Sequence, residues 1–194
     1  MKKALSPILI LPVLLCLACA SPPAAASPSG GIARENIADS RNCAVTLLKN
    51  RDYFNALCGK IREARHQIVL AFFLFRTGGH PKSYPEIVLA ELRRASRRGV
   101  PVTVVLEQDD KSGSTVSRDN RDAAERLKKA GVEIRFDAPK KTTHVKIAVI
   151  DRRYCFIGCH NLTASALKYN NELSVLVDSP DLADRTLDYI RGLY

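Results

Sequence analysis

The residues best suited to chemistry lie in HVKIAVIDRRYCFIGCHN, residues 144–161. His144 and Lys146 are two apart in a stretch that predicts a β-strand, where alternate side chains share a face. A tight turn and a returning strand then place Cys159 opposite Lys146 and Asn161 opposite His144. An imidazole, an ammonium, a thiol and a carboxamide clustered at one end of a hairpin are suited to a phosphate group.

The predicted hairpin has a specific register. Arg152 and Arg153 form a two-residue turn, which puts Asp151 opposite Tyr154. Beyond the second strand, LTASAL at residues 162–167 predicts a short helix, whose free N–H groups would favour an anion.

A second His-x-Lys pair, His80 and Lys82, is a poor candidate for the same chemistry. Pro81 is unsuited to a central strand, and Ile87 stands where the first pattern has an aspartate. The longer pattern at residues 144–161 adds an aspartate, a glycine and an asparagine at fixed offsets, which makes a fortuitous match improbable.

This pattern resembles the motif H-x-K-x4-D-x6-G-S-x-N of the phospholipase D superfamily. The segment VTLLKNRDYFNALCGKIREARHQIVLAFFLF, residues 45–75, also looks like the opening strand, helix and strand of that family. Among its members the chain is most similar to the small bacterial endonucleases that carry one motif per chain. The resemblance implies a phosphodiesterase that uses neither a metal ion nor another cofactor.

The resemblance also implies roles for single residues. His144 matches the nucleophile, which forms a phosphohistidine intermediate, and Lys146 and Asn161 match the groups that hold the non-bridging phosphate oxygens. Glu172 falls where the family keeps a carboxylate that accepts from the other ring nitrogen of the histidine. Asp151 matches the motif aspartate, although its place at a turn also suits a structural role.

Two features depart from the family pattern. Cys159 stands where serine is usual, so a weak thiol donor replaces a hydroxyl in the predicted phosphate site. The chain also has a single motif, whereas the mechanism needs a second histidine as general acid. We therefore expect a homodimer in which the two copies of His144 share one active site.

The elements around the motif predict an α/β fold. Apolar segments at 68–75 and 100–107 alternate with amphipathic segments that end at glycine, which predicts a mixed sheet flanked by helices. Ser83 and Glu86 form a predicted capping box at the start of the second helix. After Asp137 the pattern changes to the hairpin, one more strand and a closing helix.

The N-terminus predicts export. Residues 1–20 have two lysines, an apolar run and small residues, as in a signal peptide, and residues 21–34 read as a flexible linker before a catalytic domain at 35–194. Cys19 lies in a sequence that also resembles a lipoprotein box, so lipidation and simple cleavage are both open. We expect the protein to be periplasmic, anchored to a membrane as a lipoprotein, or secreted.

The charge favours a polyanionic partner. Removing Lys2 and Lys3 with the leader lowers the net charge from +10 to +8, which suits nucleic acid or anionic phospholipid. A membrane tether favours a phospholipase, whereas the single motif and basic charge favour a nuclease. The low aromatic content, 6% without tryptophan, argues against a lipid-penetrating surface. A non-catalytic nucleic-acid-binding module is the alternative from a different class.

Two other groups have functional interpretations. Cys43 and Cys58 are candidates for a disulfide, because export permits one. Glu107, Asp109 and Asp110 follow a predicted strand and suggest either a metal cluster or, more commonly for such residues, a solvated loop.

Overall fold

The computed structural model describes residues 43–109, 113–138 and 141–194. The predicted signal peptide, the linker and Cys19 lie outside these ranges. Within them, no helix is both long enough and apolar enough to cross a membrane.

Strands and helices alternate along the first half of the described chain, and the second half is mostly strand. The elements are β1 (Ala44–Lys49), α1 (Arg51–Glu63), β2 (Ile68–Phe72), α2 (Tyr84–Arg97), β3 (Val102–Leu106), α3 (Thr115–Lys128), β4 (Glu133–Phe136), β5 (Lys146–Ile150), β6 (Tyr154–Gly158), the π-helix η2 (Ser165–Tyr169), β7 (Leu173–Asp178) and α4 (Pro180–Arg191).

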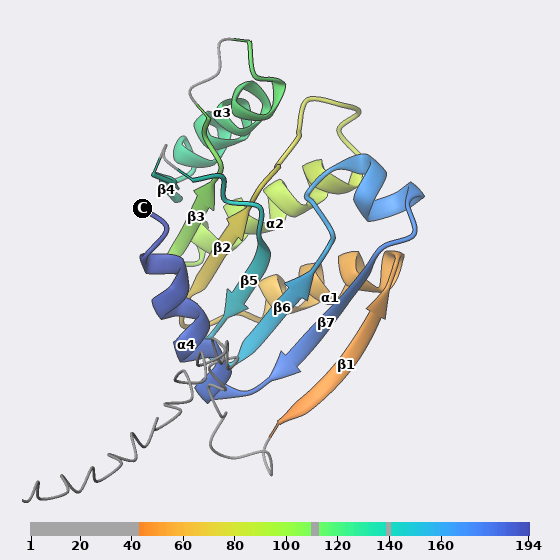
Figure 1. Ribbon diagram of the computed structural model, residues 1–194, viewed down its shortest axis with the longest axis vertical. Coiled ribbons are helices and arrows are strands. Elements are labelled where there is room, and N and C mark those ends of the chain that lie inside the picture. Colours follow the sequence, from red (N-terminus) through yellow and green to blue (C-terminus); the bar gives the residue numbers. More distant parts are fainter. Residues whose placement is uncertain (1–42, 110–112, 139–140) are drawn as a thin grey trace, which may run out of the picture. The chain divides into compact units, whose positions relative to one another are not determined.

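The described strands form one seven-stranded sheet in the order β1-β7-β6-β5-β2-β3-β4 (Figure 1). β2, β3 and β4 are parallel, while the pairs from β1 through β7, β6 and β5 to β2 are antiparallel. The predicted mixed sheet flanked by helices is confirmed. The carboxyl ends of β2, β3 and β4 therefore lie at the same edge as the start of β5, where His144 and Lys146 are found.

The helices cover the two faces unequally. Apolar side chains of α1, α2 and α3, among them Leu57, Leu89 and Leu127, pack with one face of the sheet in the larger core. The other face packs against α4 through a smaller cluster that includes Val149 and Leu187. Figure 1 shows α4 on its own side of the sheet.

Ser83 is the N-cap residue of α2, as predicted, but the capping box is not formed. Its side chain makes no cap hydrogen bond, and Glu86 instead binds Arg126 at 2.7 Å and accepts from the Gly78 backbone N–H at 2.8 Å. Tertiary pairing with a full positive charge outweighs the local cap.

The predicted register of the hairpin is wrong by one residue. Ile150 pairs with Tyr154, so the turn has three residues, and its first two, Asp151 and Arg152, have φ of 55° and 52°. Continuing the observed ladder places Lys146 opposite Gly158 instead of Cys159. The longer turn is stabilised by tertiary contacts of the Asp151 carboxylate, described below, which sequence spacing does not reveal.

The predicted disulfide between Cys43 and Cys58 is not formed, and both residues are free thiols. Cys58 lies on α1 in the larger core, whereas Cys43 packs against the cluster on the α4 face. The sheet separates the two sulfur atoms, and a disulfide requires Cα atoms within about 7 Å.

Candidate active site

His144 and Lys146 meet at the start of β5, as their spacing predicts. The Lys146 Nζ lies 3.1 Å from His144 Nδ1 and 3.2 Å from Nε2, and it also donates to the His144 carbonyl at 2.9 Å. Phe73, just beyond β2, contacts both residues, with its ring centroid 4.5 Å from the imidazole and 5.3 Å from the ammonium. His144 is exposed and Lys146 is 7% exposed, so a ligand can reach the ring while the lysine stays fixed.

The electrostatics of this pair favour a nucleophilic imidazole. Burial and then the positive charge of Lys146 lower the pKa of His144, so the ring is neutral at neutral pH. Burial also lowers the pKa of Lys146, while the negative charges of Glu172 and Cys159 partly oppose that shift. A neutral ring nitrogen beside an ammonium can attack phosphorus while the cation stabilises the phosphate oxygens.

Glu172 and Cys159 lie near Lys146, because Glu172 directly precedes β7 and Cys159 directly follows the neighbouring strand β6. The Cys159 thiol donates to the Leu173 carbonyl at 3.0 Å, and burial together with hydrogen bonding to Glu172 raises its pKa, so the thiol is protonated. Glu172 accepts from the Asn170 side chain at 3.0 Å. The predicted hydrogen bond from His144 to Glu172 is not formed among the described residues, and Glu172 acts on Lys146 through its charge.

Asn161 follows β6 and keeps an uncommitted polar atom. Its Oδ1 is buried and has no hydrogen-bond partner among the described residues. An amide oxygen only accepts, so a phosphate oxygen would have to be bound by the Nδ2 group of the same side chain. The predicted short helix after it is the five-residue π-helix η2. The Thr163 hydroxyl already accepts the Ala166 N–H at 3.1 Å, so the free N–H group expected to bind an anion is occupied there.

The motif glycine has a packing role. A Cβ on Gly158 would lie 2.1 Å from the Oγ of Ser174 on β7 and 2.5 Å from its Cα, so only glycine allows this close approach. The Ser174 hydroxyl in turn lies 2.7 Å from the Nδ1 of His160.

His160 is a residue that the sequence reasoning missed. It is fully buried, stacks on Tyr53 at 4.3 Å and bonds through Nε2 to the Asn50 carbonyl at 3.0 Å. Asn50, at φ 50°, holds Glu172 twice: its N–H donates to the Glu172 carbonyl and its Oδ1 accepts the Glu172 N–H, both at 2.9 Å. Burial lowers the pKa of His160, so it is a neutral support for this segment and not a second catalytic histidine.

Asp151, predicted as a catalytic residue, lies at the far end of β5 from His144. Its carboxylate accepts the backbone N–H groups of Arg65, His66 and Gln67, the shortest at 2.7 Å. Burial alone would raise the pKa of Asp151, but these donors outweigh it and lower the pKa. The structure thus corrects the catalytic assignment to a structural one, in which Asp151 joins the hairpin turn to the segment before β2.

The second unpredicted feature is a pair of buried carboxyl groups that bind the backbone N–H of Thr143, the residue before His144. Glu107 after β3 and Asp137 after β4 are 3% and 7% exposed. Both carboxylates accept the backbone N–H of Thr143, and the distance from Thr143 N to Asp137 Oδ2 is 3.2 Å. Burial and hydrogen bonding to Asp137 raise the pKa of Glu107 to about 7. Glu107 is therefore buried and does not belong to a solvated loop, and within residues 43–109, 113–138 and 141–194 no group of side chains is suited to a metal ion. Asp110 lies outside these ranges. A spacing pattern cannot show that the ends of β3 and β4 meet.

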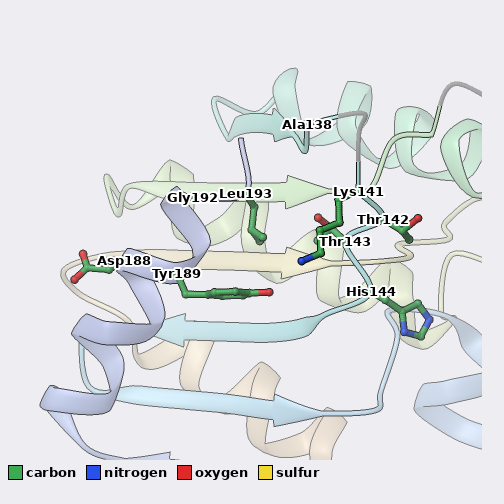
Figure 2. Close-up of a pocket in the computed structure, with 9 residues that line it drawn as sticks. All are labelled: Ala138, Lys141, Thr142, Thr143, His144, Asp188, Tyr189, Gly192 and Leu193. Carbon is green, nitrogen blue, oxygen red and sulfur yellow. The ribbon is translucent and has the colours of Figure 1, made fainter. Parts of the chain in front are cut away.

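A cavity of about 420 Å³ borders the same segment (Figure 2). It lies between the residues before β5 and the end of α4, and Tyr189 and Leu193 form part of its wall. Figure 2 shows the His144 imidazole pointing away from Tyr189 and Leu193, so the cavity is next to the backbone of His144 instead of its ring.

The comparisons with known proteins agree with this geometry. A family model described as cardiolipin synthase, PLD-like domain, matches residues 57–194. A phospholipase D of Rickettsia bellii is 28% identical over 101 residues, which are 52% of this chain and 47% of that protein. Cardiolipin synthase B of Escherichia coli K12 is 26% identical over 133 residues, 69% of this chain and 30% of that protein. The chain thus spans less than half the length of these curated relatives.

Two solved structures share the fold. Nuc from Salmonella typhimurium, described as a phospholipase D family member, superposes with a TM-score of 0.65 at 20% identity, covering 78% of this chain and 93% of that one. NucT from Helicobacter pylori gives a TM-score of 0.59 at 16% identity, covering 78% and 95%.

Proposed function

The chain belongs to the phospholipase D-like family, and from this premise we propose that it is an exported phosphodiesterase that acts through a phosphohistidine intermediate without a metal ion. The observation that carries the proposal is the exposed imidazole of His144, with a lowered pKa, held beside the buried ammonium of Lys146. Attack on a phosphodiester needs two groups, a neutral nucleophile and a fixed cation.

The reaction proceeds in two displacements. A ring nitrogen of His144 attacks phosphorus, an N–P bond forms, and the P–O bond to the leaving group breaks as that oxygen takes a proton from a general acid. Water then attacks phosphorus, gives a proton to the same group and releases His144. Lys146 and the amide of Asn161 bind the non-bridging oxygens, whose charge grows in each transition state.

The general acid is the partner's His144 in a homodimer. Among the described residues, the other histidine near the site, His160, is buried and fully bonded within its own chain. A surface suited to self-association begins beside Glu172: Leu173, Leu47 and Val45 are 52%, 51% and 62% exposed on one apolar part of the sheet. Covering it with a second copy would bury this area and bring in the missing acid.

Nucleic acid is the proposed substrate. The basic charge, the single motif and the low aromatic content favour it over a membrane substrate. Phospholipid is the second candidate, because the curated relatives are named phospholipase D and cardiolipin synthase B. A binding module without catalysis is the third, since Cys159 replaces the motif serine.

The test is turnover by the purified protein in EDTA, with plasmid DNA and phosphatidylcholine vesicles as parallel substrates. His144→Ala should abolish cleavage, whereas His66→Ala, an exposed histidine at the other end of the sheet, should leave it unchanged. Quenching in alkaline denaturant should trap the phosphoryl group on His144, because the N–P bond of phosphohistidine survives base and is hydrolysed in acid. Binding of either substrate without turnover would refute the enzyme, and an active strict monomer in size-exclusion light scattering would refute the shared site.

A further inference from the structure

Two segments leave the active-site end of the sheet side by side. Phe75 and Leu162 form a parallel bridge, the Leu162 N–H donates to the Leu74 carbonyl, and the Arg76 N–H donates to the Leu162 carbonyl, both at 3.0 Å. One segment continues from Phe73, which contacts the His144 ring, and the other follows Asn161. A pocket formed where these two segments continue is therefore next to the proposed phosphate site.

A pocket of about 240 Å³ lies where these segments continue. Its walls come from the loop before α2, the start of α2 and the π-helix η2, and they contain no carboxylate. The lining residues are His80, Lys82, Ser83, Tyr84, Ala164, Lys168 and Tyr169. The volume is below the roughly 300–1,000 Å³ of sites that enclose a whole small molecule, so it suits one ring of a longer ligand.

Aromatic rings and cations alternate around this pocket. The Lys168 ammonium lies 4.9 Å from the Tyr169 ring centroid and 6.0 Å from that of Tyr84, and the Arg51 guanidinium lies 5.7 Å from Tyr84. Tyr84 is fixed by stacking on Phe54 at 4.1 Å, while Tyr169 is 71% exposed. π-Helical turns are rare and occur most often at functional sites, and this one carries both Lys168 and Tyr169.

We propose that this pocket binds single-stranded nucleic acid beside the scissile phosphate, with a base stacked on Tyr169 or Tyr84 and neighbouring phosphates on Lys168 and Lys82. A base must be unstacked to lie on a tyrosine ring, which selects a single strand over a duplex. In a nucleic acid, phosphates alternate with bases, so the pocket's cations would bind the phosphates and its tyrosine rings would stack on the bases. The proposal rests on the proposed function and narrows its substrate to nucleic acid.

The experiment measures binding and turnover separately. Binding of a fluorescein-labelled oligothymidylate is followed by anisotropy in the full-length His144→Ala protein, with and without Lys168→Gln and Tyr169→Ala. The two changes should weaken binding about tenfold or more, the effect of losing one stacked base and one phosphate contact. The salt dependence should also fall by about 0.7 in the slope of log K against log salt concentration.

A matched control carries Lys128→Gln and Tyr194→Ala, an exposed lysine and an exposed tyrosine outside the pocket, and should bind as before. With His144 intact, hydrolysis of bis(p-nitrophenyl) phosphate should be unchanged by the pocket changes, because this small diester does not extend into the pocket.

Unchanged oligonucleotide binding in the pocket variant would overturn the proposal, as would an equal loss in the control. Weakened binding to phosphatidylglycerol vesicles with oligonucleotide binding intact would also overturn it, in favour of a lipid site. The proposed function fails by a different result, the absence of His144-dependent hydrolysis of bis(p-nitrophenyl) phosphate. That result does not depend on the oligonucleotide measurements, so the two failures are distinguishable.

Discussion

The buried carboxyl pair that binds the Thr143 N–H makes the stability of this protein depend on pH in an unusual direction. Glu107 and Asp137 share the Thr143 N–H, and Asp109 adds a third negative charge nearby. The pKa of Glu107 rises from an ordinary 4.5 to about 7 in the folded chain. Between these values the folded protein binds more protons than the unfolded chain, so this group's contribution to stability decreases as the pH increases.

The magnitude follows from the shift. Each unit of pKa difference corresponds to about 1.4 kcal/mol, so ionising Glu107 removes about 3 kcal/mol between pH 4.5 and 7.5. Other carboxylates, such as Asp151 with its lowered pKa, act in the opposite direction and mask this effect in the total. The Glu107 contribution must therefore be isolated as a difference between two proteins.

The substitution Glu107→Gln isolates the contribution of Glu107 to the pH dependence of stability. A glutamine can accept the Thr143 N–H and donate to Asp137, as the protonated acid does, but it does not titrate. We expect the variant to match the wild type within about 1 kcal/mol near pH 5 and to exceed it by about 2–3 kcal/mol at pH 8. Urea unfolding followed by circular dichroism from pH 5 to 8.5 measures this difference.

Asp137→Asn is the contrasting variant. Both Asp137 oxygens accept backbone N–H groups, from Gln108 at 2.7 Å and from Thr143 at 3.2 Å, so one side of the asparagine amide would face a donor and this variant should be less stable than Glu107→Gln throughout the pH range. A stability difference between Glu107→Gln and the wild type that stays constant with pH would refute the raised pKa of Glu107. If Glu107→Gln were less stable than the wild type at every pH, both carboxylates would instead be ionised and individually required.

Three further substitutions test the remaining assignments. Asp151→Asn should cost about 1.5–3 kcal/mol in urea unfolding but leave turnover per folded molecule unchanged; a large loss of kcat in folded protein would restore its catalytic role. Gly158→Ala should destabilise the fold by about 1–3 kcal/mol, because its Cβ meets Ser174, and Ser174→Gly should recover part of that loss. Cys159→Ser should raise the rate of phosphodiester cleavage by strengthening a donor to phosphate, and an unchanged rate would mean that position 159 does not contact the substrate.

The sequence predicted the parts of this site that depend on local rules. Alternation along a strand placed His144 and Lys146 together, and the motif spacing identified the strand that carries them. The hairpin register was wrong because Asp151 is held by the N–H groups of residues 65–67, more than eighty positions away. A turn that tertiary contacts stabilise can take a left-handed conformation at a non-glycine residue, which turn statistics alone disfavour.

The supports of the site could not be predicted because they join elements that only the sheet order brings together. Cys43 and Cys58 are near in sequence, yet the sheet lies between them. Glu107 and Asp137 meet because β3 and β4 are parallel neighbours that end at the same edge. Such pairings are properties of topology, and a single sequence without an alignment carries little signal for them.

The same topology explains why the motif needs its glycine. Without a side chain at Gly158, β7 approaches closely enough for Ser174 to reach His160, and His160 then holds the carbonyl of Asn50. Asn50 fixes the backbone of Glu172 on both sides, and the charge of Glu172 opposes the loss of the proton from Lys146. Gly158 therefore affects the charge of Lys146, the lysine beside His144, through five successive contacts. Its effect on catalysis should appear as a changed pH dependence of kcat in whatever fraction of Gly158→Ala remains folded.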